Sequence, residues 1–253
     1  MAHKSMNGHG SLRVGVVSDL DESIETLLSH LTAAEREQAK ALPTMRRIRQ
    51  YVIGRLAARK AIRELLETRR SVSSIEILSE LDQAPFGKVN GVMDQVGISI
   101  SHSSRLAVAC AWLAHSSRLS SAGIDLEYVR SNEVVESYAF SRAERKLLFQ
   151  APEGPEITAL AAWTVKESVW KALLADQAIG PNAIDIQQQS LAQGRAVVTV
   201  KGLLAKRLGH SNLQVQMGKI LGPDGAYVFS LTQVVPPKRR QPPTGLVESR
   251  WIG

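Results

Sequence analysis

The most constraining feature of this sequence is the order of its strand-like and helix-like segments. A strand-like stretch, LRVGVV at 12–17, is followed by helical patterns and then by several short strand-like runs. The same order begins again at GIDLEYV, 123–129, although the two parts share negligible identity. Strands that cluster rather than alternate with helices favour an α+β fold over a doubly wound sheet. The sequence therefore predicts two similar α+β halves.

Hydrophobic periodicity predicts the individual elements. Thr32 followed three residues later by Glu35 forms a capping box, which predicts the start of a helix. Further helices are expected at about 46–67, 133–138, 141–149 and 157–175, and PFGKVNG at 85–91 is expected to be a turn. The expected strands are 12–17, 73–79, 96–101, 106–113, 123–129, 183–187, 195–200, 213–220 and 226–235.

The polar stretch AHSSRLSSAG at 114–123 is expected to connect the two halves. The predicted organisation is then a flexible leader at 1–10, an N-terminal half at 11–118, a C-terminal half at 119–235 and a basic, proline-rich tail at 236–253. The tail is expected to be a solvated, disordered end.

Composition limits the class of protein and its partners. A hydrophobic fraction of 44% and a charged fraction of 22% are typical of a globular protein. One cysteine, Cys110, cannot form an internal disulfide, and no apolar run is long enough for a membrane span, so a cytoplasmic protein is expected. The net charge of +7, with an arginine-rich segment at 44–65, favours an anionic partner.

Two carboxylates, Asp125 and Glu127, lie two residues apart on the strand-like GIDLEYV. On a strand they project from the same face, where their like charges repel. One solution is an exposed edge at which both acids face water. The other is a hard divalent cation such as Mg²⁺, with waters and phosphate oxygens completing its coordination.

A third acid occurs in WTVKESVWK, 163–171, where Glu167 and Lys171 share one face of a predicted helix. The simplest interpretation is a surface ion pair worth a few tenths of a kcal/mol. However, Trp163 and Trp170 flank this pair, which is unusual for a solvated face. The alternative is that Glu167 is a metal ligand or a base and that Lys171 contacts a phosphate.

Two further segments could contact an anion. ISISHSS, 98–104, ends a predicted strand with Ser101 and His102, which are either structural hydrogen-bonding groups or phosphate contacts. Lys88 lies in the predicted turn and is either solvated or able to reach an anion. The sequence contains no zinc-binding motif, nucleophile elbow or P-loop.

The motifs Gly87-Lys88, ISHS (100–103), GIDLE (123–127) and WTVKESVWK occur in the order found in the Sfp-type 4′-phosphopantetheinyl transferases, and the chain resembles that family. The resemblance implies two similar α+β halves related by a pseudo-twofold axis, with a coenzyme A site in the cleft between them. It also implies a Mg²⁺-dependent enzyme, expected to be a monomer. Such an enzyme transfers phosphopantetheine from coenzyme A to a serine of an acyl or peptidyl carrier protein and releases 3′,5′-ADP.

The resemblance also implies roles for individual residues. Asp125, Glu127 and Glu167 would hold the metal against the pyrophosphate, and Glu127 or Glu167 would be the base. The remaining residues would contact coenzyme A: Lys171 a phosphate, Ser101 and His102 the nucleotide and its 3′-phosphate, Lys88 the adenine and phosphate side, and Arg49 the 3′-phosphate.

The chain departs from the family pattern at two places. Val89 follows Gly87-Lys88 where the family usually has proline, so a less rigid turn is expected. Basic residues that some members carry in the first helix fall near Glu35 and Gln38 here, which shifts the expected 3′-phosphate contacts toward the arginine-rich segment.

Two other functions are compatible with parts of the sequence. A nucleic-acid-binding module would use the arginine-rich helix, would bind with strong salt dependence and would not need Asp125. Against it stand an aromatic content of 5% and the lack of a nucleic-acid-binding motif. A catalytically dead scaffold of the same fold would have lost one of the three acids, and all three are present.

Overall fold

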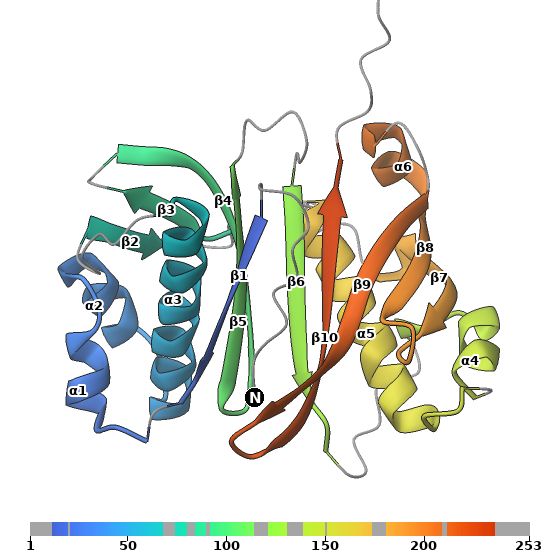
Figure 1. Cartoon of the computed structure of the whole chain (residues 1–253), viewed down its shortest axis with the longest axis horizontal. Helices are drawn as coiled ribbons and strands as arrows, with labels where there is room; N and C mark the ends of the chain where they lie inside the picture. The colour runs from blue at the N-terminus through green and yellow to red at the C-terminus, as the bar shows by residue number, and fades with distance from the viewer. Residues whose placement is uncertain are drawn as a thin grey trace, which may run out of the picture.

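The structure is a computed structural model in which two five-stranded sheets stand side by side, each with a long helix against it (Figure 1). The predictions for the leader, for a helix at 133–138 and for the tail lie outside the described residues. The connection predicted at 114–123 lies outside them as far as residue 120, and its last three residues begin a strand, Ser121–Tyr128, instead. The described residues are 12–19, 21–67, 74–79, 84–89, 92–113, 121–130, 139–149, 151–173, 181–208 and 212–235.

The first half contains five strands and three helices within its described residues. They are β1 (Leu12–Ser18), α1 (Ile24–Ser29), α2 (Ala33–Lys40), α3 (Met45–Leu65), β2 (Ile75–Leu78), β3 (Phe86–Val89), β4 (Val92–Ser103) and β5 (Leu106–Leu113). The long helix α3 packs against β1, β5 and β4.

The second half repeats this plan, and its long helix α5 packs against β6 and β10. Its described elements are β6 (Ser121–Tyr128), α4 (Arg142–Phe149), α5 (Pro155–Ala172), the 3₁₀ helix η3 (Pro181–Ala183), β7 (Ile184–Ser190), β8 (Arg195–Val200), α6 (Gly202–Leu208), β9 (Asn212–Gly222) and β10 (Gly225–Val234).

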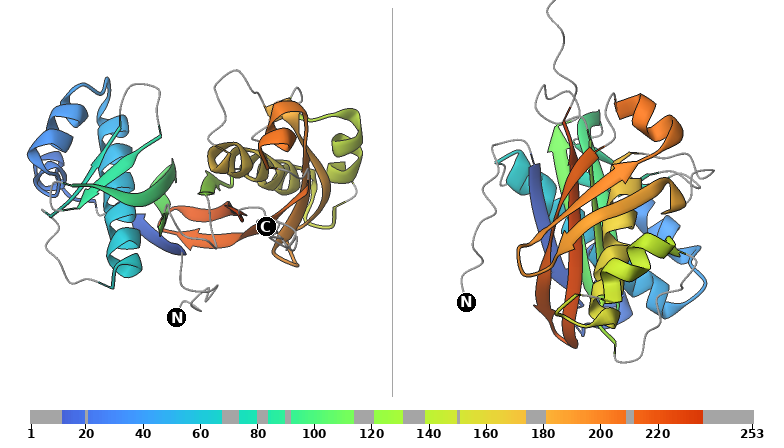
Figure 2. Two further views of the ribbon diagram at one scale, coloured as in Figure 1. Left: turned by 90° about the horizontal axis from the view of Figure 1, so that it is seen from above. Right: turned by 90° about the vertical axis from the view of Figure 1, so that its right-hand side faces the viewer.

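The two sheets have the same topology. Their strand orders are β1-β5-β4-β3-β2 and β6-β10-β9-β8-β7, so adding five to each strand number of the first sheet gives the second. All neighbouring strands are antiparallel. Viewed from above, the halves lie side by side and each long helix lies beside its own sheet (Figure 2). The predicted α+β fold with two similar halves is confirmed.

The structure corrects the sequence-based prediction for 85–91. Lys88 lies in strand β3 rather than in a turn, opposite Glu76 of β2 and Met93 of β4. Phe86 and Val89 favour a strand, and the short run is held between two partner strands, which outweighs the turn-forming residues around it. The short helices α1 and α6 were also not predicted, whereas the strands at 106–113 and 195–200 have the predicted bounds.

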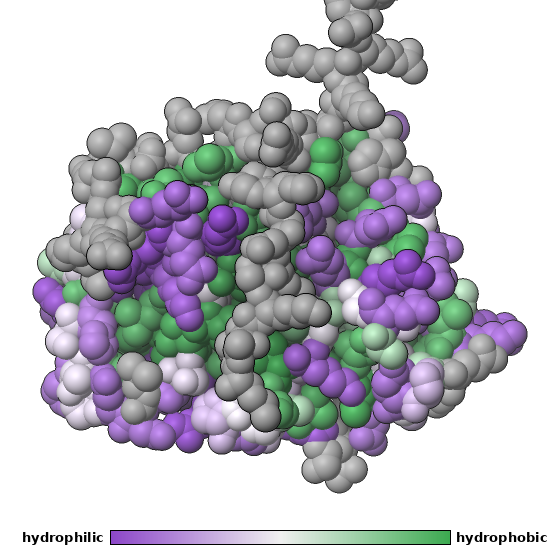
Figure 3. All heavy atoms as spheres, in the orientation of Figure 1, coloured by the Kyte–Doolittle hydropathy of each residue, from purple (hydrophilic) through white to green (hydrophobic). Residues whose placement is uncertain are grey.

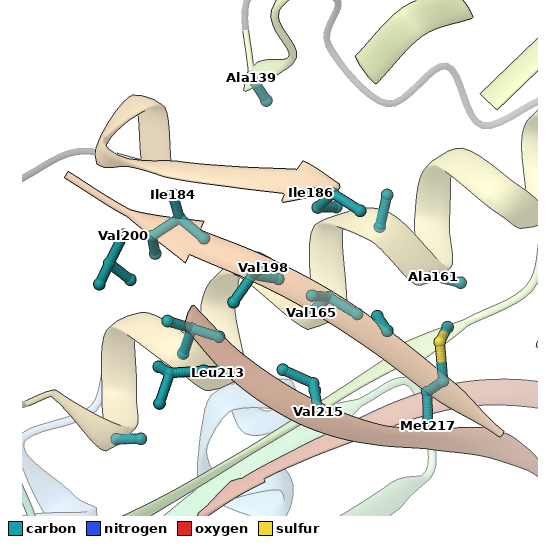
Figure 4. Close-up of a cluster of buried hydrophobic side chains, with 14 of the residues drawn as sticks. Ala139, Ala161, Val165, Ile184, Ile186, Val198, Val200, Leu213, Val215 and Met217 are labelled. Atoms are coloured by element: carbon teal, nitrogen blue, oxygen red, sulfur yellow. The ribbon is translucent and has the colours of Figure 1, made fainter. Parts of the chain in front are cut away.

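Three apolar clusters fill the interior of the sheets. One lies between α3 and the first sheet, and one between α5 and the second sheet, where Val165 meets Val198 and Val215 (Figure 4). The third cluster joins the halves, because Val108 and Trp112 of β5 belong to it together with strands β6 and β10. The two halves therefore share an apolar cluster at their junction.

A buried ion pair ties the helices of the first half to its sheet. Glu35 is fully buried, pairs with Arg59 of α3, and accepts backbone N–H bonds from Thr32 at 2.8 Å and from Ile77 at 2.7 Å. The Thr32 hydroxyl accepts the Glu35 N–H, so the predicted capping box is confirmed. Glu35, one of the two departures from the family pattern in this helix, therefore has a structural role.

The second half contains the same arrangement. Glu144 pairs with Lys166 of α5 at 2.9 Å and accepts backbone N–H bonds from Ser141 at 2.7 Å and from Ile186 at 2.8 Å. Both charged side chains are almost completely buried. Lys166 therefore has a structural role, unlike that expected for Glu167 and Lys171 of the same sequence motif. The two halves therefore share a buried ion pair as well as their strand order.

Gly123 allows α5 to lie directly on β6. A Cβ atom at this position would overlap the carbonyl oxygen of Ser168, which is backbone and cannot move aside easily. We expect Gly123→Ala to lower the free energy of unfolding by about 1–3 kcal/mol, measured by urea denaturation. Gly87→Ala is the control, because its Cβ would meet only the ends of flexible side chains, of which Ile98 is the nearest at 3.0 Å. If Gly123→Ala and Gly87→Ala had the same free energy of unfolding, the close contact between α5 and β6 would be contradicted.

The surface drawn in Figure 3 mixes hydrophilic and hydrophobic side chains over both halves. None of the helices in the described part of the chain is both long and apolar enough to cross a membrane.

Candidate active site at the junction of the two halves

The site forms where strand β4 of the first half meets strand β6 of the second. β6 is the edge strand of its sheet, paired on one side with β10, and β4 lies on its other side. Asp125 and Glu127 both belong to β6, two residues apart, so their side chains leave the same face of the strand. The two predicted acids are therefore held on a rigid strand at the junction.

The Asp125 carboxylate is buried and only partly satisfied by the protein. Its Oδ1 accepts hydrogen bonds from the Ser101 hydroxyl at 2.8 Å and from Lys171 Nζ at 2.6 Å. Its Oδ2 is buried and has no hydrogen-bond partner in the described structure. The structure thus brings together Asp125, Ser101 and Lys171 from three different elements.

Glu167 lies one turn before Lys171 on α5 and is half-buried. The pKa of its carboxyl is raised above the usual value, first by burial and second by the charge of Asp125, while Lys171 opposes the shift. Lys171, one turn further along the same face of α5, contacts Asp125 at 2.6 Å, and this geometry places Glu167 and Asp125 on the same side of the junction. Lys171 forms its ion pair with Asp125, so the simple Glu167–Lys171 surface pair is not the observed arrangement.

Glu127 is bound differently from Asp125. Its Oε2 accepts a hydrogen bond from the Ser103 hydroxyl at 2.9 Å. Ser103 lies two residues after Ser101 on β4, so the two serines point in the same direction. Each acid of β6 is therefore held by one serine of β4.

The chemistry of these side chains fits a hard divalent cation. Two acids sharing a site, one of them with a buried oxygen lacking a partner, would both be relieved by a cation between them. Within the described ranges, however, no three His, Cys, Asp or Glu side chains converge into a ready-made metal site. Asp125 is hydrogen-bonded through Oδ1 by Lys171 and Ser101, and Glu127 through Oε2 by Ser103, so each of these two acids keeps a second oxygen that could face a cation.

A partly buried histidine and two arginines of α3 lie on the first-half side of the site. The pKa of His102 is lowered, mainly by burial and further by the nearby charges of Lys171, Arg47 and Arg55. His102 Nδ1 and Arg55 Nε are both buried without a hydrogen-bond partner in the described structure. The Arg55 guanidinium stacks on the Tyr51 ring at 3.8 Å, which holds it in place. These groups can receive an anion.

Two other residues predicted for the site, Arg49 and Lys88, have other neighbours in the structure. Arg49 forms an ion pair with Asp19 at 3.0 Å and donates to the Glu22 carbonyl at 2.8 Å, so its guanidinium is already engaged. Lys88 pairs with Met93 of β4, and the distance along that strand from Met93 to Ser101 is about 26 Å. Lys88 therefore lies toward the far end of β4.

Ser103 was not predicted as a member of this site, and Arg47 and Arg55 were expected only as part of the arginine-rich segment. The alternation of Ser99, Ser101 and Ser103 along one face of a predicted strand was a usable signal for Ser103. Nothing in the sequence singled out Arg47 and Arg55 from the other arginines of their helix. Two of the seven basic residues of that helix, Arg55 and Arg59, are buried and do not belong to a free basic surface.

The comparisons with known proteins agree with this geometry. A family model described as "4'-phosphopantetheinyl transferase superfamily" matches residues 121–229. The chain is therefore similar to this superfamily over less than half of its length, within its C-terminal half. This superfamily region runs from β6 into β10 and carries Asp125, Glu127, Glu167 and Lys171. His102 and the arginines of α3 lie before it.

The other comparisons add little to the superfamily match. Among solved structures, holo-[acyl-carrier-protein] synthase (AcpS) from Thermotoga maritima is similar, at 21% identity and a TM-score of 0.36. The similarity covers 56% of this chain and 91% of that one. None of the curated proteins compared matches the chain. The similarity to the superfamily therefore rests on the match to residues 121–229 alone.

Proposed function

We propose that this protein transfers the 4′-phosphopantetheine arm of coenzyme A to a serine of an acyl or peptidyl carrier protein, in a Mg²⁺-dependent reaction that releases 3′,5′-ADP. The observation that carries the proposal is the shared site of Asp125, Glu167 and Lys171 within the superfamily region. Two carboxylates and an ammonium in one site suit the handling of a pyrophosphate and its metal.

In this proposal the second half of the chain supplies the reacting side of the site. Asp125, Glu127 and Glu167 would hold Mg²⁺, whose charge would stabilise the negative charge that develops on the pyrophosphate oxygens. Lys171, which already lies on this side of the site, would contact a phosphate. Its position on the rigid helix α5 limits the reorganisation needed during the reaction.

The bond changes follow from the substrates. The carrier serine oxygen forms a bond to the phosphorus that carries the pantetheine arm, and the bond from that phosphorus to the bridging oxygen of the pyrophosphate breaks. The bridging oxygen leaves with 3′,5′-ADP. Glu127 or Glu167 would accept the serine proton, directly or through a water.

The first half of the chain would bind the nucleotide end of coenzyme A. His102, Arg47 and Arg55 lie close enough for their charges to interact, and two of their nitrogens are buried without a partner in the described structure. These three residues are better placed than Arg49 to meet the 3′-phosphate, because Arg49 is paired with Asp19. A role for Lys88 would be limited to the far end of β4.

The proposed setting is a monomer in a reducing compartment such as the cytoplasm. The only cysteine of the sequence, Cys110, is buried in the core shared by the halves, which gives it a packing role. Since the junction of two fused halves already forms the site, a second copy of the chain is not needed to complete it.

Product analysis tests this function. The full chain is incubated with coenzyme A, Mg²⁺ and an apo carrier protein, and nucleotides are separated by chromatography. The proposal expects 3′,5′-ADP in an amount equal to the carrier that is modified, and none when the carrier serine is replaced by alanine. Release of 3′,5′-ADP without a carrier protein would indicate simple hydrolysis and contradict the proposed transfer.

Charge on α3 is expected to affect the two substrates differently. Arg46 and Arg47 are exposed, but the charge of Arg47 also reaches His102. We expect Arg46→Glu to raise the KM for an acidic carrier protein about two- to fivefold and to leave the KM for coenzyme A unchanged. We expect Arg47→Glu to raise both. Steady-state kinetics at two salt concentrations measures these effects, and an unchanged carrier KM in both variants would exclude this docking surface.

A further inference from the structure

Three serines of β4 form a regular ladder along the free edge of β6. Ser99, Ser101 and Ser103 occupy alternate positions of β4 and therefore point to the same side. Their hydroxyl oxygens accept the backbone N–H groups of β6 residues 124, 126 and 128 at 3.1, 3.2 and 3.0 Å. Because β6 is an edge strand, these N–H groups have no sheet partner on that side. The ladder thus joins the two sheets.

Ser101 and Ser103 each make a second hydrogen bond, to an acid of β6, and Ser99 has no acid opposite it. Ser101 donates its proton to Asp125 Oδ1 at 2.8 Å, and Ser103 donates to Glu127 Oε2 at 2.9 Å. At the rung of Ser99, the equivalent residue of β6 is Gly123, which has no side chain. Ser99 is therefore a control that the chain itself provides.

A serine hydroxyl has only one proton to donate. In this structure the protons of Ser101 and Ser103 are used on carboxylates, so neither hydroxyl can donate to a phosphate without releasing its acid. The bond from Ser101 fixes the direction of the Asp125 carboxylate and leaves Oδ2, which has no hydrogen-bond partner in the described structure, buried at the site. Hydroxyl groups that orient carboxylates in this way act through the acids rather than on the substrate.

We infer that Ser101 and Ser103 are positioning residues that orient Asp125 and Glu127 for a divalent cation, rather than contacts for coenzyme A. This inference rests on the proposed function, since it concerns the same site. It assigns a role to Ser103 and changes the role expected for Ser101. It also means that the first half of the chain supplies the groups that hold the acids of the second half.

The test compares Ser99→Ala, Ser101→Ala and Ser103→Ala in the full chain. All three variants lose one rung between the sheets, so we expect similar decreases in their melting temperatures. Only Ser101→Ala and Ser103→Ala also lose a hydrogen bond to an acid of β6. Binding of Mn²⁺ is measured with coenzyme A present, and free Mn²⁺ is followed by its electron paramagnetic resonance signal. We expect Ser101→Ala and Ser103→Ala to bind Mn²⁺ about 10- to 100-fold more weakly than the wild type. Ser99→Ala should stay within about twofold of the wild-type affinity. Ser103→Thr, which keeps the hydroxyl, should restore Mn²⁺ binding.

Two results would overturn the inference. If Ser99→Ala weakens Mn²⁺ binding as much as the other variants, the ladder is only a structural tie between the sheets. If Ser101→Ala raises the KM for coenzyme A while Mn²⁺ affinity is unchanged, Ser101 contacts the substrate. Transfer by the wild-type chain is measured first on the same preparation. Its absence contradicts the proposed function, whereas normal transfer with three indistinguishable variants contradicts the inference alone.

Discussion

Asp125→Ala is expected to lower the rate of phosphopantetheine transfer by at least about 10²- to 10³-fold. The substitution removes the acid that binds Lys171 and shares its site with Glu167. It removes a ligand of the proposed metal and leaves the Lys171 ammonium without its partner. The rate is measured as carrier protein modified per unit time at saturating coenzyme A and Mg²⁺.

Asp185→Ala is the matched control for this loss of activity. Asp185 also forms an ion pair with a lysine, Lys201, but it lies on β7 at the outer edge of the second sheet. We expect its transfer rate to equal that of the wild type. The far-ultraviolet circular dichroism of both variants should show a folded protein. An Asp125→Ala variant that is folded and fully active would contradict the assignment of the site.

Glu144→Ala is expected to lower the free energy of unfolding by about 3–5 kcal/mol. Glu144 and Lys166 are both almost fully buried, and Lys166 Nζ has Glu144 at 2.9 Å as its countercharge. Removing the carboxylate takes this countercharge away from a buried ammonium that keeps its hydrogen bond to the Ala139 carbonyl. It also leaves the N–H groups of Ser141 and Ile186 without their acceptor. Urea denaturation followed by tryptophan fluorescence measures the change.

An exposed ion pair of the same chemistry serves as the control. Glu37 and Lys40 on α2 form a contact at 2.6 Å, but their side chains are 72% and 66% exposed. Glu37→Ala is expected to change the free energy of unfolding by no more than about 0.5 kcal/mol. If Glu144→Ala costs no more than Glu37→Ala, the Glu144–Lys166 pair does not stabilise the second half in the way described here.

The sequence was sufficient to predict the α+β class and the division into two similar halves, because the strand and helix patterns follow each other in a repeated order. It also predicted the common face of Asp125 and Glu127, since alternation along a strand is a local property. The capping box of Thr32 and Glu35 is local as well. These features depend only on residues close together in the sequence.

The features that the sequence analysis missed depend on contacts between distant segments. Strand β3 forms because two partner strands hold it, although its own residues include turn formers. The burial of Glu35 and Lys166 depends on helices and strands that pack around them. The serine ladder requires β4 and β6 to meet across two sheets, which no local pattern indicates.

The central claim is that the junction of β4, β6 and α5 is a phosphopantetheinyl transfer site. Intact-mass spectrometry of an apo carrier protein incubated with this chain, coenzyme A and Mg²⁺ tests it most directly. The account predicts the addition of one phosphopantetheine arm, and its loss both in EDTA and with Asp125→Ala. An unchanged mass across several acyl and peptidyl carrier proteins, or modification that persists in Asp125→Ala, would contradict it.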